Sequence, residues 1–189
     1  MRLPIAKYGD PILRAKGRPI AKIDDELRAL AADMLETMHA ANGVGLAAQQ
    51  VGRALQLTVL DISQVEDRPS TLKLNGGEVD PIASMPLVLI NPQLDFGEEK
   101  ILGSEGCLSI PDITADVMRA VTVTARAKTL ENEEIAIEAS GLLARALQHE
   151  VDHLHGILFI DRISSAAKAS LASRLKRMQK ENARLQVKS

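Results

Sequence analysis

Two histidines, His149 and His153, stand at the spacing that a helical metal site needs, with Glu150 between them. Residues four apart lie on the same face of a helix, so both imidazoles can reach one cation. Glu150 would point aside and contact a water molecule at that cation rather than the cation itself. These residue types at this spacing predict a catalytic metal site. His39 and His155 have no partner at ligand spacing and are expected to be ordinary structural imidazoles.

The residues around this motif favour a helix. Strong helix formers occupy positions 141–148, Ser140 is placed to cap the N-terminus, and Gly156 is placed to end the helix. Residues of one face are expected to be buried, as a metal-bearing helix at the centre of a fold should be. That face consists of Leu143, Ala146, Leu147, Glu150 and Leu154.

Two imidazoles leave the coordination of a metal ion incomplete, and the single cysteine, Cys107, is the leading candidate for a third ligand. It lies in the segment 105–111, where Gly106 permits close backbone approach and Pro111 is expected to end the extended segment. A lone cysteine excludes an internal disulfide and is most often a small buried apolar residue. A thiolate with two imidazoles nevertheless leaves a fourth position open for water, as catalytic sites do.

A segment of small residues at 43–52 follows a long amphipathic pattern between Asp24 and Ala41, so Gly43 is expected just past the end of a helix. The glycines are not followed by Gly-Lys-Ser/Thr and are not preceded by a strand, which disfavours nucleotide binding. Gln50 carries an uncharged amide that can donate a hydrogen bond to a developing oxyanion. The alternative interpretation is a solvated glutamine in a turn.

These three clusters together resemble the peptide deformylase family, whose pattern is G-x-G-L-A-A-x-Q, then E-G-C-L-S-x-P, then Q-H-E-x-D-H-L-x-G. The matching segments are 43–50, 105–111 and 148–156, in the same order. The opening segment, residues 8–14, is also similar to the N-terminal segment of the family. The resemblance covers most of the chain, and three motifs at consistent spacing are far more specific than the metal helix alone.

The resemblance implies a role for each matching residue. The implied metal ligands are Cys107, His149 and His153. Glu150 would be the general acid and base, while Gln50 and the backbone N–H of Leu108 would hold the oxyanion. The family removes the formyl group from the N-terminal formylmethionine of newly made peptides and releases formate. The resemblance implies one divalent ion, Fe²⁺ first and Zn²⁺ as the alternative, since a thiolate and two imidazoles suit both.

The expected substrate contacts are Val44, Gly45, Gly106, Leu142 and Arg145. Val44 and Leu142 would form walls of the pocket for the methionine side chain, and Gly45 would let the substrate backbone lie close.

Three positions depart from the family pattern. Thr114 stands in a stretch where many members have an arginine that contacts the substrate backbone. Gly103 stands where an aliphatic residue often lines the side-chain pocket, and Arg145 lies one turn before His149 on the same helix face. These departures predict a wider or more polar pocket.

The predicted fold class is α+β, with antiparallel or mixed strands packed around a central metal-binding helix and a C-terminal helix. Alternating and apolar runs predict strands near 55–60, 87–90, 121–125 and 135–137. Residues 1–165 are expected to form the catalytic domain, and 166–189 a basic amphipathic helix of the same domain. The polar stretch 64–85 is expected to be a mobile surface loop.

Charge is concentrated at the C-terminus. From residue 165 onward there are seven basic residues against one acidic residue, a net charge of +6 in a chain whose total is −2. The basic residues are Lys168, Arg174, Lys176, Arg177, Lys180, Arg184 and Lys188, and the acidic one is Glu181. The simplest expectation is a solvated terminal helix. The resemblance favours a helix that docks on the ribosome, where formylated nascent chains emerge.

Other partners and other activities are less favoured by the sequence. No apolar run is long enough to span a bilayer and no leader pattern is present, so a bacterial cytoplasmic protein without DNA or membrane partners is expected. A metallopeptidase would share the two histidines and Glu150, but such enzymes usually present a histidine or glutamate in place of Cys107. A non-catalytic peptide-binding relative is the second alternative, against which intact Glu150 and Gln50 argue.

Overall fold

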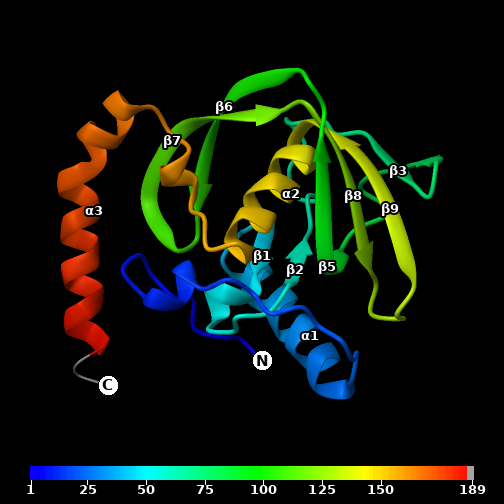
Figure 1. Ribbon diagram of the computed structural model, residues 1–189, viewed down its shortest axis with the longest axis horizontal. Helices are drawn as coiled ribbons and strands as arrows, with labels where there is room; N and C mark the ends of the chain where they lie inside the picture. Colours follow the sequence, from blue (N-terminus) through cyan, green and yellow to red (C-terminus); the bar gives the residue numbers. More distant parts are fainter. Residues whose placement is uncertain (187–189) are drawn as a thin grey trace.

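The computed structural model describes residues 1–186, and the side chains of residues 1–184. The fold is α+β, as predicted, with strands wrapped around a central helix and a long C-terminal helix on the flank (Figure 1). The α-helices are α1 (Asp25–Ala40), α2 (Gly141–Leu154) and α3 (Ser165–Gln186). Short 3-10 helices are η1 (Pro11–Arg14), η2 (Ala48–Val51) and η3 (Phe159–Asp161). No helix in the described part of the chain is both long and apolar enough to cross a membrane.

Seven strands form one sheet in the order β1-β2-β5-β8-β9-β3-β4, and two more form a separate ribbon, β6-β7. The strands of the large sheet are β1 (Gly45–Ala47), β2 (Leu57–Leu60), β3 (Leu72–Leu74), β4 (Gly77–Val79), β5 (Leu87–Phe96), β8 (Thr122–Lys128) and β9 (Glu134–Ser140). The ribbon consists of β6 (Lys100–Cys107) and β7 (Ile110–Ala120). Every pairing between these strands is antiparallel. Strands are present at all four predicted places. Strands β5, β8 and β9 extend past the predicted 87–90, 121–125 and 135–137, whereas β2 is shorter than the predicted 55–60 and begins at Leu57.

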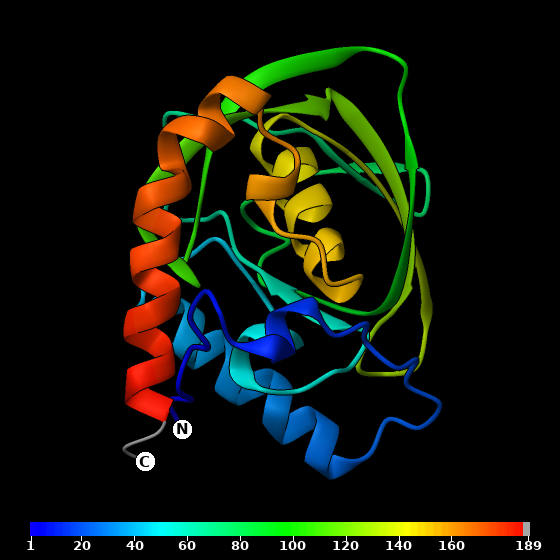
Figure 2. The same ribbon diagram turned by 60° about the vertical axis from the view of Figure 1, so that its left-hand side comes forward.

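Helix α2 lies between the large sheet and the β6-β7 ribbon (Figures 1 and 2). All of its residues from Leu142 to Leu154 are buried, including the polar ones. On one side, Leu143 and Leu147 pack into the apolar cluster formed with β2, β5, β8 and β9. A second apolar cluster joins β7 to α3 and includes residues of η1 and η3. The helix that carries the histidine motif is therefore held from several directions, which limits how far its side chains can move.

The helix ends differ in detail from the prediction. Helix α1 ends at Ala40, and the left-handed residue that follows is Asn42, with φ of 54°, rather than Gly43. Asparagine tolerates this conformation better than most residues, and the Gly43 N–H then donates to the Met38 carbonyl at 2.9 Å. Ser140 is the N-cap of α2 by position, but its hydroxyl bonds that of Thr71 instead of capping the helix.

Pro111 was expected to end the extended segment, and this expectation is wrong. Strand β7 continues through Pro111 to Ala120. The pairing of β6 with β7 shifts between Gly106, opposite Thr114, and Cys107, opposite Ile110. Residues 111–113 therefore bulge out of the ladder, where the missing N–H of a proline costs no hydrogen bond. Beside this bulge, β6 ends at Cys107, whose sulfur lies 3.3 Å from Nε2 of His153 on α2.

The stretch 64–85 is not a loop throughout, in contrast to the prediction. It contains β3 and β4, which form a hairpin, and β3 pairs with β9 to extend the large sheet. Asn75, with φ of 50°, and Gly76, with φ of 83°, form the tight turn between the two strands. The short strands escaped prediction because three residues are too few to establish an alternating pattern.

Helix α3 runs alongside the N-terminal segment and the β7 bulge rather than projecting freely (Figure 2). Leu171 and Leu175 are buried against the cluster that includes Ile110 and Ile113. The expectation of a solvated helix therefore holds only for its outer face. Lys188 lies outside the described residues, as does the side chain of Leu185.

Candidate metal centre

The three predicted metal ligands come together in the structure. Helix α2 presents His149 and His153 from successive turns, with ring centroids 4.9 Å apart, and β6 delivers Cys107 at its last residue. One ligand atom from each residue can be chosen so that all lie within 4.8 Å of one another. The Cys107 sulfur lies 3.3 Å from Nε2 of His153. Two such ligands on one tetrahedral ion would be about 3.5 Å apart, so the donor set fits a divalent metal.

Glu105 fixes the orientation of His149. Its Oε2 lies 3.0 Å from Nδ1 of the imidazole, which leaves Nε2 for the centre of the site. Arg119 donates to both oxygens of Glu105, at 2.8 and 2.9 Å. Burial acts to raise the pKa of Glu105, but the bonds from Arg119 and His149 hold it well below its usual value. The carboxylate is therefore charged and supports the basicity of His149.

Sequence reasoning gave Glu105 no role of its own. Residues 105 and 107 lie two apart on β6, so alternation places their side chains on the same face. This two-residue spacing is the sequence signal that could have assigned Glu105 to the same site as Cys107. The partner, Arg119, lies on β7 opposite Ile101, four residues along the strand from Ala115, which faces Glu105, so it could not be assigned from the sequence.

Asp152 ties the same arginine to the metal helix. It accepts from Nη1 of Arg119 at 2.6 Å and from two nitrogens of Arg162 at 2.5 Å each. Arg119 thus bridges the carboxylates of Glu105 and Asp152 in a buried network. Breaking one partner of such a network would leave a buried charge uncompensated, so it holds α2 and the β6-β7 ribbon in one relative position.

Cys107 has the electrostatic character of a metal ligand. Burial acts to raise the pKa of its thiol, but the charge of His153 and the hydrogen bond with His149 outweigh burial and hold that pKa well below its usual value. The thiolate is the form that binds a metal.

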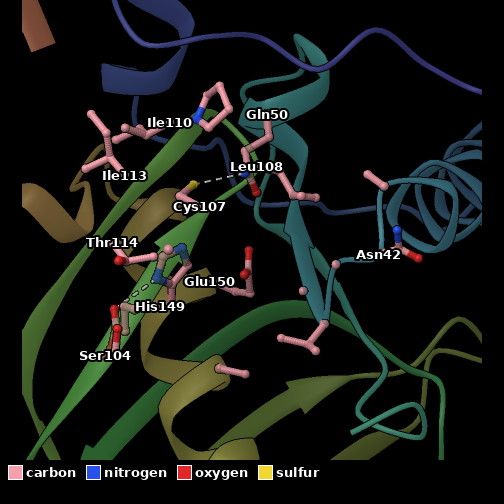
Figure 3. Close-up of a pocket in the computed structure, with 18 of the residues that line it drawn as sticks. Asn42, Gln50, Ser104, Cys107, Leu108, Ile110, Ile113, Thr114, His149 and Glu150 are labelled. Atoms are coloured by element: carbon pink, nitrogen blue, oxygen red, sulfur yellow. Dashed lines mark hydrogen bonds and ion pairs between the residues drawn. The ribbon is translucent and has the colours of Figure 1, made fainter. Parts of the chain in front are cut away.

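Gln50 lies beside the cysteine in η2 and is only 1% exposed, so it is not a solvated turn residue. Its Nε2 lies 3.4 Å from the Cys107 sulfur (Figure 3). The same nitrogen lies 3.2 Å from Oγ of Ser109. Its Oε1 accepts from the backbone N–H of Ala47 at 2.9 Å, which identifies the end of the amide that faces the sulfur. The amide N–H group is therefore aimed at the centre rather than at solvent.

Glu150 points into the same cavity from α2, toward β1 (Figure 3). It is 4% exposed, and Oε2 has no hydrogen-bond partner within the described part of the chain. Burial raises the pKa of Glu150. Oε1 lies against Gly45, where a Cβ would be only 2.4 Å away. The predicted close approach at Gly45 is thus, in this structure, the approach of Glu150 itself.

The cavity around these groups has a volume of about 490 Å³. Leu108 and Thr114 line it. All five predicted substrate contacts line it as well, namely Val44, Gly45, Gly106, Leu142 and Arg145. Leu108 also packs over Gly43, where a Cβ would meet its Cδ1 at 2.8 Å. Its lining combines apolar side chains with the polar groups of the candidate metal centre, which suits a peptide end carrying one apolar side chain.

Gly103 and Arg145, which we singled out separately, are in direct contact. Nη1 of Arg145 donates to the Gly103 carbonyl at 3.2 Å and to Oε1 of Glu105 at 2.9 Å. It also donates to the Val117 carbonyl at 3.0 Å, and Nη2 donates to the Ile101 carbonyl at 3.0 Å. The guanidinium of Arg145 is therefore bonded to the β6-β7 ribbon, and it shares the charge of Glu105 with Arg119.

The remaining histidines have ordinary structural partners, as expected. Nε2 of His39 lies 2.8 Å from Oδ2 of Asp61, and Nδ1 of His155 lies 2.8 Å from the Val151 carbonyl.

A buried helix with paired histidines, a thiolate from an adjacent strand and an unpartnered glutamate define a class of α+β metallohydrolase-like domains. The family model for polypeptide deformylase matches residues 2–169. The chain belongs to the peptide deformylase family and is an enzyme of that type.

Individual relatives agree with this assignment over nearly the whole chain. The peptide deformylase of Methylacidiphilum infernorum is 45% identical over 188 residues, covering 100% of this chain and 98% of the relative. That of Acinetobacter baumannii is 41% identical over 186 residues, covering 98% and 96%. Among solved structures, a plant peptide deformylase, PDF1B, superposes with a TM-score of 0.82 at 36% identity, covering 95% of this chain and 90% of that one. The enzyme from Thermus thermophilus superposes with a TM-score of 0.81 at 36% identity, covering 96% and 99%.

Proposed function

We propose that this enzyme hydrolyses the N-formyl group of peptides that begin with formylmethionine. The observation that carries the proposal is the meeting of Cys107, His149 and His153 beside the unpartnered oxygen of Glu150, in a cavity with room for one peptide end. The overall reaction adds water to the formyl carbon and breaks the bond to nitrogen. Formate and a free amino terminus are the products.

Cys107, His149 and His153 would hold one divalent ion, for which we propose Fe²⁺ before Zn²⁺. When bound, such an ion supplies Lewis-acid activation of water and of the formyl carbonyl. Glu105 would keep His149 in the ligating orientation, since it accepts the Nδ1 proton. The low pKa of the Cys107 thiol keeps the ligand in its thiolate form.

Glu150 would move the proton. Its buried carboxylate accepts a proton from the attacking water and returns it to the amine as the carbon–nitrogen bond breaks. A pKa raised by burial suits a group that must both take and release a proton near neutral pH. The N–H of the Gln50 amide and the backbone N–H of Leu108 would stabilise the oxygen of the formyl group as negative charge develops on it.

The apolar part of the cavity would bind the methionine side chain. Val44 and Leu142 line it, and Gly106 leaves room at the end of β6. Arg145 also lines it, but its guanidinium is engaged by Glu105 and by ribbon carbonyls. We therefore propose an apolar pocket with a polar base, in which unbranched side chains other than methionine are discriminated only weakly, by about 1 to 3 kcal/mol per methylene.

The direct test compares a formyl-Met-Ala-Ser peptide with its acetylated counterpart and with an internal peptide bond. Formate release from the first substrate alone supports deformylation. Cleavage of an internal bond would support the metallopeptidase alternative, and binding without turnover would support a non-catalytic relative. Measurement of metal content after purification without oxygen distinguishes iron from zinc.

Two variants separate chemistry from binding. Glu150→Gln should retain the metal and lose most of kcat, because an amide cannot accept and return the proton. Gln50→Ala should lower kcat by about 10²- to 10³-fold, the usual effect of removing one oxyanion donor. A change confined to KM in either variant would contradict its proposed role.

We also propose that residues 1–165 act as the catalytic part and that the helix beginning near residue 166 carries the enzyme to the ribosome. The outer face of α3 is rich in exposed basic residues, including Lys176, Lys180 and Arg184. Such a face is attracted to RNA-rich surfaces. Formylated chains arise at bacterial ribosomes, so the bacterial cytoplasm is the proposed site of action.

A further inference from the structure

A second cavity, of about 290 Å³, lies between helix α3 and the bulge of β7. Its walls are Lys7, the bulge residues Pro111, Asp112 and Ile113, and five residues of α3: Arg174, Arg177, Met178, Glu181 and Asn182. Lys7 and the three bulge residues also line the cavity of the metal centre. The two cavities therefore share one rim, and α3 forms the far wall of a continuous depression.

We infer that this second cavity binds the part of the substrate peptide that follows its first few residues, with a preference for acidic side chains. The inference rests on the proposed deformylase function. A peptide whose formylated end occupies the metal centre must leave that cavity across its rim. An extended chain advances about 3.3 Å per residue, so a few further residues suffice to cross the bulge.

The walls are held in place by contacts that α3 makes with both sides of the rim. Arg174 donates to the carbonyl of Asp112 at 2.5 Å, and Asn182 donates to the carbonyl of Lys7 at 3.2 Å. The Lys7 ammonium in turn donates to the Leu108 carbonyl at 2.8 Å. The shape of the cavity is thus coupled to the loop that carries the Leu108 backbone.

The charges of the cavity favour an anionic occupant. Lys7 and Arg174 each donate to a backbone carbonyl. A carbonyl carries no net charge, and neither side chain forms an ion pair with any described residue, so both positive charges remain uncompensated. Arg177 has Glu181 at 4.0 Å, in a pair that is largely exposed and therefore weak. Asp112 contributes one negative charge, so the lining carries three cations and two anions. Met178 adds an apolar side chain to the lining.

The test uses two long formyl peptides that share the first four residues and then carry either two aspartates or two lysines. The readout is the ratio of kcat/KM for the acidic peptide to that for the basic one. In the wild-type enzyme this ratio should be about 2 to 5, the size of effect expected from weak exposed ion pairs. The two peptides should differ in KM and not in kcat. Turnover of formyl-Met-Ala-Ser, which is too short to reach α3, tests the proposed function separately.

Arg177→Glu should abolish or reverse the ratio. Lys176→Glu is the matched control, because it makes the same charge change on the same helix but does not line the cavity. Arg174→Glu should act like Arg177→Glu, and if it unfolds the protein through loss of its Asp112 contact, Arg177→Glu still decides the question. A wild-type ratio of one, or equal shifts in Arg177→Glu and Lys176→Glu, would overturn the inference.

Discussion

The guanidinium of Arg145 occupies the space beside Gly103 that a side chain there would need. A Cβ built on residue 103 would lie 2.8 Å from Nη2 and 2.9 Å from Cζ of Arg145. The two departures from the family pattern are therefore one structural feature: a large cationic side chain on α2 is accommodated by the absence of a side chain on β6. The pocket is not simply wider, since the room left by glycine is filled by arginine.

This relationship predicts strong coupling between the two positions. Gly103→Ala should lower the free energy of unfolding by about 1 to 3 kcal/mol, because the added methyl displaces a hydrogen-bonded guanidinium. In the double variant with Arg145→Leu, the two effects should differ from additivity by at least about 0.5 kcal/mol. Urea denaturation of the four proteins measures the cycle. Additive effects would show that the contact has no energetic importance.

Gly45 is predicted to be required for the position of Glu150. In Gly45→Ala the new methyl would lie 2.4 Å from Oε1 and 2.7 Å from Cδ of the glutamate, so the carboxylate must move. We expect kcat to fall by about 10²- to 10⁴-fold, the usual contribution of a general base, with metal content unchanged. Gly77→Ala in β4 is the control, since its Cβ would meet only an ordinary contact at 3.6 Å. Unchanged kcat in Gly45→Ala would show that Glu150 tolerates displacement.

Cys107→Ser is predicted to lose metal and activity together while the fold persists. A hydroxyl is a poor substitute for a coordinating thiolate, whereas the volume of the side chain hardly changes. Elemental analysis and circular dichroism of the purified variant provide the two readouts. If the iron form is native, exposure of the wild type to air should inactivate it, and reloading with Zn²⁺ should restore part of the activity. A serine variant with full activity and one bound metal would show that Cys107 is not a metal ligand.

The packing of α3 changes what truncation is expected to do. Removal of the chain from residue 170 onward would expose Ile110 and Ile113 and delete the buried Leu171 and Leu175. We therefore expect loss of stability and impaired turnover, and not the nearly unchanged catalysis that a solvated helix would allow. The ribosome proposal is better tested with Lys176→Glu and Lys180→Glu, which leave the buried face intact. Co-sedimentation with ribosomes at two salt concentrations should show weaker binding of the double variant, and equal binding would dismiss this helix as the docking element.

Asp61 is predicted to contribute to the pH dependence of stability. Burial acts to raise its pKa, but hydrogen bonds from Ser63 and His39 hold it below its usual value. A carboxylate with a lowered folded pKa stabilises the protein above the unfolded value of about 3.9, and this contribution is lost as the pH falls through the folded pKa. Asp61→Asn should therefore lower the free energy of unfolding by about 1 kcal/mol at neutral pH.

The difference between wild type and Asp61→Asn should shrink toward zero as the pH falls through the lowered folded-state pKa of Asp61, below which the carboxyl is protonated in both states. Glu66→Gln, at an exposed residue of the same region, provides the comparison. Urea denaturation at several pH values gives the curves. A difference that stays constant with pH would assign the effect to packing rather than to charge.

Much of the site was available from the sequence alone, because its parts are local. The spacing of His149 and His153 determines their common face on any helix, and strong helix formers surround them. The identity of the single cysteine limited the sulfur ligand to Cys107. The α+β class followed from short apolar strands and long amphipathic helices, whose periods differ.

The tertiary structure decided the features that join residues distant in the chain. Glu105 orients His149 only because β6 packs beside α2, and no local pattern in the sequence specifies that packing. The contact of Gly103 with Arg145 and the shared rim between α3 and the metal centre depend in the same way on how separate elements pack. The spacing at which side chains return to one face of a helix or strand depends on a few neighbouring residues. Packing depends on the volumes and hydrogen bonds of the whole chain at once.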